Sequence, residues 1–235
     1  MKRIIHFWIM GLVCILTVSL SGPVHADFYF ESEQSAEGVP SFPGQGKLIK
    51  TYLTAGATRT ESGDRITIMN SQTMTTYELN PSNKTYTQHD MREMQGMPKM
   101  EGTQKEQLER MMKQMADSMK ITPTKETRRI AGYDCRKYDV QFMMAKGVYW
   151  VTREIKGYDE FRKLTLDMAK AFEQNPMMKQ MNVLAMMDQI DGFPVMTVMD
   201  VMGGKITTTL KMIEQKPLDK DLFEVPKGYT RTESQ

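Results

Sequence analysis

Apolar and polar residues recur with different periods along this chain, and the changes of period predict its secondary structure. From residue 47 to residue 88 the chain is rich in Thr, Tyr and Ile between frequent turn residues, which is typical of short β-strands. The strands predicted there are residues 47–53, 64–69, 74–79 and 84–87. A first short strand is predicted at 28–30, and the Gly- and Pro-containing segment 32–46 predicts a loop. Together these segments predict an antiparallel meander.

Two later segments carry apolar residues at helical spacing. Thr103 and Glu106 form a capping box at the start of an amphipathic helix, residues 104–119, whose charged residues lie off the apolar stripe. A second stripe ends at Asn175 and Pro176, a pair that also suits the start of a further helix. The stripes consist of Leu108, Met111, Met112, Met115 and Met119, and of Phe161, Leu164, Met168 and Phe172. We therefore predict Met-rich helical insertions at about residues 90–120 and 158–190.

Strand-like patterns return after each helical segment. They predict strands at residues 124–130, 133–143, 148–155, 193–202 and 205–213, the last two joined by a hairpin at Gly203 and Gly204. The order is strands, helix, strands, helices, strands, without the strand–helix alternation that requires a parallel sheet. The sequence therefore predicts an α+β fold in which helices gather on one face of an antiparallel sheet.

The N-terminus has the pattern of a secretory signal. Lys2 and Arg3 precede an apolar run, residues 4–20, and small residues ending at Ala26 follow it. The run is short for a membrane-spanning helix, so we predict a Sec-type signal peptide, residues 1–26, rather than an uncleaved anchor. Cys14 lacks the small preceding residue of a lipoprotein site. We expect a soluble periplasmic protein of one domain, residues 27–235.

Charge and residue counts in the mature chain exclude several classes of function. The whole chain has 31 Lys and Arg against 29 Asp and Glu, and the signal peptide contains only Lys2 and Arg3, so 29 of each remain. A neutral chain does not bind nucleic acid through bulk charge. The one remaining histidine, His89, and the one remaining cysteine, Cys135, exclude an internal disulfide and zinc sites built from several such residues. We predict a protein without enzymatic activity and without a cofactor.

Five segments resemble a known family. They are NPSNKTYTQ (80–88), RRIAGYDCRKYDV (128–140), VYWVTREI (148–155), GFPVMTVM (192–199) and DLFEVPKGY (221–229). The chain resembles an uncharacterised family of exported bacterial domains of unknown function, similar in shape to the outer-membrane lipoprotein carrier (LolA/LolB-like) superfamily. The resemblance implies a strongly curved antiparallel sheet, a half-open β-barrel, with helices packed on its concave face. It implies a hydrophobic groove for lipid acyl chains and brings no catalytic residues.

Methionine is several times more frequent than usual, with 24 residues, of which Met1 and Met10 belong to the signal peptide. Because methionine is unbranched and polarizable, it suits surfaces that accept apolar partners of different shape. We therefore predict that the residues of the two helical stripes line a cavity. The expected ligand is a lipid, a lipoprotein acyl chain or another apolar molecule, and peripheral contact with the inner or outer membrane is expected.

The segment MREMQGMPKM, residues 91–100, lies in a connection that Gly96 and Pro98 keep from being helical. Its thioethers allow an alternative function, because soft sulfur ligands suit Cu(I). The residues of this alternative copper site are Met91, Met94, Met97 and Met100, with His89 beside them. A flexible apolar lid over the groove is the preferred interpretation. A structural or interaction module of the envelope without a small ligand is a third hypothesis.

Overall fold

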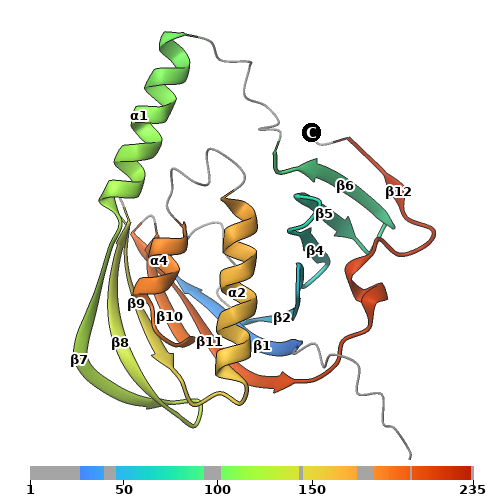
Figure 1. The fold of residues 1–235 in the computed structure, drawn as a ribbon. Coiled ribbons are helices and arrows are strands. Elements are labelled where there is room, and N and C mark those ends of the chain that lie inside the picture. The colour runs from blue at the N-terminus through green and yellow to red at the C-terminus, as the bar shows by residue number, and fades with distance from the viewer. Residues whose placement is uncertain are drawn as a thin grey trace, which may run out of the picture.

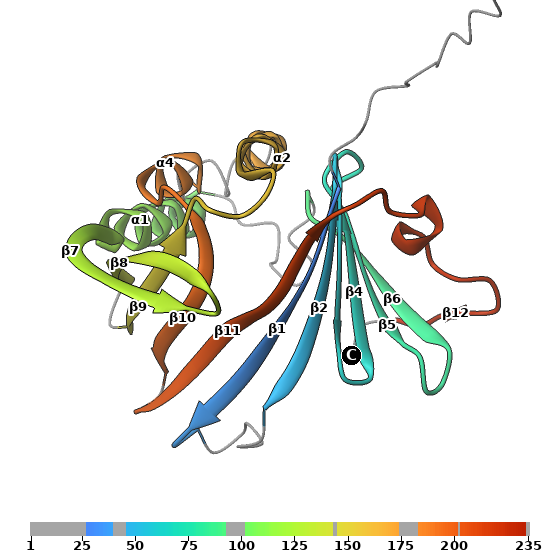
Figure 2. The same ribbon diagram turned by 90° about the horizontal axis from the view of Figure 1, so that it is seen from below.

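The computed structural model describes residues 27–39, 46–92, 102–142, 145–173, 183–201 and 203–233. Within these ranges twelve strands form one sheet, which is strongly bent and open, with its two edges well apart (Figures 1 and 2). The predicted signal peptide and most of the segment 91–100 lie outside the described residues. No helix in the described ranges has both the length and the apolar content needed to cross a membrane.

The strand order across the sheet is β12-β6-β5-β4-β3-β2-β1-β11-β10-β9-β8-β7. Neighbouring strands are antiparallel, except that β12 runs parallel to β6. The strands are β1 (Phe28–Glu37), β2 (Lys47–Thr54), β3 (Ala57–Ser62), β4 (Arg65–Asn70), β5 (Thr75–Asn80), β6 (Thr85–Asp90), β7 (Lys120–Ile130), β8 (Tyr133–Phe142), β9 (Ala145–Thr152), β10 (Phe193–Val201), β11 (Gly204–Gln215) and β12 (Thr230–Arg231). The predicted mostly antiparallel, curved sheet is confirmed. Pairing of β1 with β11 joins the start of the domain to its end.

The sequence pattern missed several stretches of strand, of which two are long. Residues 32–37 belong to β1 instead of a loop, and residues 57–62 form the unpredicted strand β3. Both segments are polar, ESEQSAE from residue 31 and ATRTES from residue 57, so neither has the alternation that indicates a half-buried strand. Each is nevertheless hydrogen-bonded to a strand on both sides, and that pairing holds them in the sheet.

The helices are α1 (Thr103–Ser118), α2 (Tyr158–Phe172), α4 (Val183–Gln189) and a short 3-10 helix, η1 (Lys220–Phe223). Phe161 packs α2 against the sheet. The centroid of its ring lies 5.6 Å from that of Phe28 on β1 and 5.0 Å from that of Phe193 on β10. α2 also contacts α4, whereas α1 contacts β8 and extends beyond the strands (Figure 1).

A hydrophobic core lies where α2 meets β1 and β8 to β11. Its buried members are Cys135, Trp150, Ile155, Phe193, Val195 and Leu210. Cys135 is only 1% exposed, its thiol lies 3.5 Å from the carbonyl oxygen of Tyr133, and burial raises its pKa. A buried thiol that resists ionisation is a poor nucleophile, so Cys135 acts as a small apolar core residue.

A buried arginine ties the C-terminal segment to the sheet. Arg59 of β3 is 8% exposed, its Nε donates to Glu61 at 2.7 Å, and its Nη1 donates to the carbonyl oxygen of Leu222 in η1 at 3.0 Å. Beyond η1 the chain reaches the sheet edge, where the Thr232 amide donates to the carbonyl of Tyr86 at 2.8 Å. Arg59 is therefore the polar link between β3 and the segment that leads to β12.

We expect Arg59→Gln to lower the free energy of unfolding by about 2 kcal/mol, because it leaves Glu61 and the Leu222 carbonyl without their charged donor. Urea denaturation measures this change. The matched control is Arg65→Gln on the next strand, where the side chain is exposed and an effect within about 0.5 kcal/mol is expected. Equal effects in the two variants would contradict the assigned role of Arg59.

Candidate functional site

A cavity of about 250 Å³ lies between α2, the α4 segment and strands β9 and β10. Ligand sites for drug-sized molecules occupy roughly 300–1,000 Å³, so this space suits one alkyl chain or a small ring system. The lining residues are Tyr149, Tyr158, Phe161, Arg162, Thr165, Leu166, Met187, Ile190, Gly192 and Pro194. Most of these residues present carbon atoms, so the cavity is apolar in character.

One face of α2 forms a wall of this cavity. The lining positions 158, 161, 162, 165 and 166 recur at spacings of three and four, which places them on the same side of a helix. The helix starts after Gly157, whose φ of 75° is left-handed and whose carbonyl oxygen accepts from the Phe161 amide at 2.9 Å. Local sequence thus fixes where the helix starts, and the ring contacts of Phe161 fix how it lies on the sheet.

Strands β9 and β10 form the opposite wall through Tyr149, Pro194 and the preceding Gly192. Gly192 has a φ of 154°, and a β-carbon there would lie 2.7 Å from Cγ2 of Val151. A glycine is therefore required for the chain leaving α4 to approach β9 this closely. That approach brings Ile190 and Met187 over the cavity.

Two hydroxyl groups in the wall have hydrogen-bond partners within the protein. The Tyr158 hydroxyl donates to Oδ1 of Asp191 at 3.1 Å, and the Thr165 hydroxyl donates to the carbonyls of Phe161 and Arg162 at 3.1 and 3.0 Å. Burial raises the pKa of both Tyr158 and Tyr149, which keeps the two phenols neutral. Apart from the guanidinium of Arg162, the wall therefore offers mainly aromatic and aliphatic surface.

His89 and Cys135, the histidine and the cysteine of the predicted mature chain, lie far apart in the sheet. His89 lies on β6, with Nε2 3.1 Å from the Thr87 hydroxyl, whereas Cys135 lies on β8 near the other edge of the sheet. The described ranges contain no cluster of three or more His, Cys, Asp or Glu side chains that could hold a metal ion. What this site can do chemically is bind an apolar group.

Six of the nine residues predicted to line a cavity have described side chains, and one of these six, Phe161, lines the cavity found here. Phe161 lines the cavity described here, while Leu164, Met168 and Phe172 of the same helix are half-buried and are not among its described lining residues. Met168 instead lies on β3, where the Thr58 hydroxyl is 3.7 Å from its sulfur. On α1, Met111 is 49% exposed and Met119, just beyond the helix, is half-buried. The side chains of Leu108, Met112 and Met115 lie outside the description.

Sequence reasoning missed most of the residues that line the cavity. Helical spacing could have identified four of them, because they flank the apolar stripe of α2: Tyr158, Arg162, Thr165 and Leu166. Tyr149, Met187, Ile190, Gly192 and Pro194 come from other elements, and no local pattern marks them.

The alternative copper site lies mostly outside the described residues. Met91 follows β6 and its amide donates to the carbonyl of Met74 at 2.7 Å, and His89 lies on β6. Met94, Met97 and Met100 are outside the description. The Cu(I) hypothesis therefore stays a prediction from the sequence.

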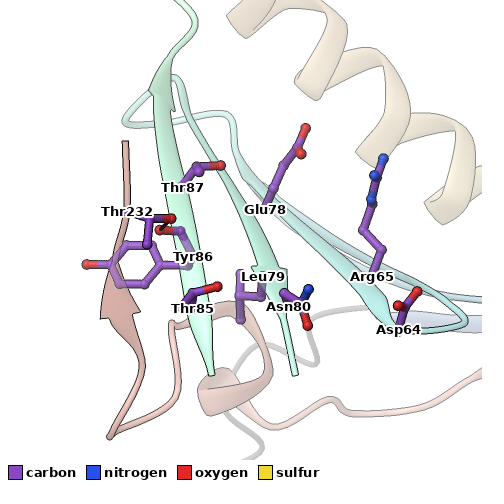
Figure 3. Close-up of a pocket in the computed structure, with 9 residues that line it drawn as sticks. All are labelled: Asp64, Arg65, Glu78, Leu79, Asn80, Thr85, Tyr86, Thr87 and Thr232. Carbon is purple, nitrogen blue, oxygen red and sulfur yellow. Dashed lines mark hydrogen bonds between the residues drawn. The ribbon is translucent and has the colours of Figure 1, made fainter. Parts of the chain in front are cut away.

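A second, polar depression of about 220 Å³ lies on β4, β5, β6 and the C-terminal segment (Figure 3). Its lining residues are Asp64, Arg65, Glu78, Leu79, Asn80, Thr85, Tyr86, Thr87 and Thr232. The side chains of Arg65 and Glu78 extend from the strands on the side of the neighbouring helix, and both residues are exposed. Water competes for hydrogen bonds with such exposed groups, so the apolar cavity is the stronger candidate site.

Several solved structures are similar to this chain. PNGF-II shares 12% identity at a TM-score of 0.41, over 89% of this chain and 32% of its own length. MucB in complex with MucA(peri) shares 9% sequence identity at a TM-score of 0.40, over 85% of this chain and 54% of its own length. A LolA superfamily protein, NE2245 from Nitrosomonas europaea, shares 8% sequence identity at a TM-score of 0.35. This match covers 85% of this chain and 90% of that protein. The chain thus spans about a third of the length of PNGF-II.

No curated protein matches the chain. The profile of one protein family matches residues 44–229 and is described as a domain of unknown function, DUF4412. This match covers most of the chain and includes all five segments from which the family resemblance was predicted. The chain therefore belongs to the DUF4412 family of domains of unknown function.

Proposed function

We propose that this protein is an exported, non-enzymatic binding protein that holds an acyl chain or another small apolar ligand between α2, α4, β9 and β10. The apolar cavity of about 250 Å³ is the observation that carries the proposal. The N-terminal 26 residues would direct the chain to the periplasm as a cleaved signal peptide. Removing an alkyl chain from water into such a cavity contributes about 25 cal/mol per Å² of apolar surface.

The proposal includes helices packed on the concave face of the sheet. Its support is the set of α2 contacts: Phe161 with β1 and β10, and Met168 with Thr58 of β3. Strands β1, β3 and β10 are spread across the sheet order, so one helix that reaches all three spans a bent surface.

Ligand exchange in this proposal depends on helices that carry few contacts. α4 has seven residues and contacts α2, so its displacement exposes the cavity at small cost. The predicted apolar stripe on α1, with Met111 already half in solvent, provides a surface for a lipid, a lipoprotein acyl chain or a membrane during transfer. The balance of basic and acidic residues leaves no role for nucleic acid.

A series of linear alcohols tests the proposal. Hexanol, octanol, decanol and dodecanol displace a neutral fluorescent probe, and each added methylene is expected to lower Kd roughly fourfold, from about 0.8 kcal/mol of burial. The gain should stop once the alkyl chain exceeds the cavity. No displacement by any alcohol, or affinity independent of chain length, would contradict apolar ligand binding.

A further inference from the structure

We infer that the cavity selects apolar ligands that carry an anionic oxygen group, and that Arg162 is the specificity-determining residue that receives this group. The inference rests on the proposed function and names the ligand class of the same cavity. Arg162 is the one positively charged side chain among the described residues that line the cavity. It stands on α2 between the apolar lining residues Phe161 and Leu166.

The exposure of Arg162 places the charged end of a ligand at the mouth of the cavity. Its side chain is 43% exposed, so the guanidinium reaches water while its stem belongs to the wall. A ligand with one apolar and one charged end fits this arrangement, because its chain is buried while its anionic group stays partly hydrated. A fully apolar ligand leaves the guanidinium unused.

Arg162 is only loosely engaged by the protein itself. Its Nη2 lies 3.4 Å from Oδ1 of Asp188 on α4, and both side chains are open to solvent. Such exposed pairs contribute about 0–1 kcal/mol. A guanidinium carries five N–H donors, so most of the hydrogen-bonding capacity of Arg162 is not taken by this contact.

Arg153, the neighbouring arginine, is engaged differently. Its Nε donates to Oδ1 of Asp191 at 2.8 Å, and its Nη2 forms a second contact with the other oxygen of the same carboxylate. The hydroxyl of Tyr158 donates to that carboxylate as well. Arg153 and Asp191 therefore neutralise each other in a two-point pair, which leaves Arg162 as the cation for a ligand.

An anionic oxygen group can bind Arg162 more strongly than Asp188 does. Carboxylates and phosphates accept two parallel hydrogen bonds from a guanidinium at short distance, and such charge-assisted bonds are roughly twice as strong as neutral ones. Asp188 is exposed and can turn to water at little cost. A hydroxyl head offers one neutral hydrogen bond in the same place, so it should be bound less tightly.

Dodecanoate and dodecanol, which share the same alkyl length, test this selection by displacing a neutral fluorescent probe at pH 8. Dodecanoate should bind at least about threefold tighter to the wild type, a ratio expected of a partly exposed charge pair. In Arg162→Gln the preference for dodecanoate over dodecanol should disappear, and Arg162→Lys should keep part of it. Lys163→Gln is the matched control, because it removes an exposed cation that does not line the cavity and should leave the preference intact.

Dodecyl phosphate as a third probe distinguishes a phospholipid source from a fatty acid, and tighter binding of either anion than of dodecanol supports the inference. Equal affinities for all three in the wild type, or a preference that survives Arg162→Gln, would overturn it. A loss of dodecanol binding in Arg162→Gln would also overturn it, since Arg162 would then only hold the structure. If none of the three binds, the proposed function itself is wrong.

Discussion

Leu166→Trp is expected to weaken dodecanol binding at least about tenfold, because the indole occupies space that the alkyl chain would fill. Leu166 lines the cavity on α2, and the space there is about 250 Å³. Each methylene of the ligand that is excluded from the cavity removes about 0.8 kcal/mol of binding free energy, so excluding two or more weakens binding at least about tenfold. Displacement of the neutral fluorescent probe measures the affinity, and thermal melting shows whether the variant is folded.

Leu164→Trp is the matched control for this prediction. It makes the same substitution two residues away, where the side chain points about 200° around the helix and is not among the described lining residues. We expect dodecanol affinity within about twofold of the wild type, since Leu164 touches no part of this space. If Leu164→Trp abolished binding while Leu166→Trp retained it, the ligand would occupy the face of the predicted stripe instead of the cavity.

The sequence predicted which side of α2 is apolar, but it did not predict which residues of α2 line the cavity. Apolar spacing indicated Leu164 and Met168 because a periodic pattern reports which side of a helix avoids water. It does not report which neighbours meet that side, and Met168 turned out to lie on Thr58. The cavity sits on the flank of the stripe, where the polar residues Arg162 and Thr165 are excluded from any apolar pattern.

Strands were predictable where the burial of side chains leaves a pattern in the sequence. They were not predictable where main-chain hydrogen bonds alone hold a polar segment in the sheet. Strands β2, β5 and β10 were predicted to within about two residues because their side chains show typical strand composition. The unpredicted strand β3 contains Arg59 and Glu61, two charged residues that pair with each other beneath η1. The burial of Arg59 depends on a segment about 160 residues later in the chain, and no local rule can supply that partner.

Phe193→Ala is expected to lower the free energy of unfolding by about 3–5 kcal/mol, the usual effect of removing a buried phenyl ring. Phe193 is 2% exposed, and its ring lies edge-on to Phe30 at 5.4 Å and near Phe161 at 5.0 Å between centroids. It therefore joins β1, β10 and α2 at one point. Urea denaturation measures the loss, and Phe193→Leu, with a smaller expected loss, serves if the alanine variant does not fold.

Phe172→Ala provides the comparison, because Phe172 is a half-buried phenylalanine on α2 without a ring partner among the described residues. It should lower stability by no more than about 2 kcal/mol.

The two variants should also differ in function, since Phe161 both lines the cavity and rests on Phe193. Folded Phe193→Leu should bind dodecanol more weakly, because Phe161 can then move into the space left beneath it, whereas Phe172→Ala should bind as the wild type does. A Phe193 variant that loses stability but keeps full affinity would show that the cavity wall does not depend on this contact, and that α2 is held in place by its other neighbours.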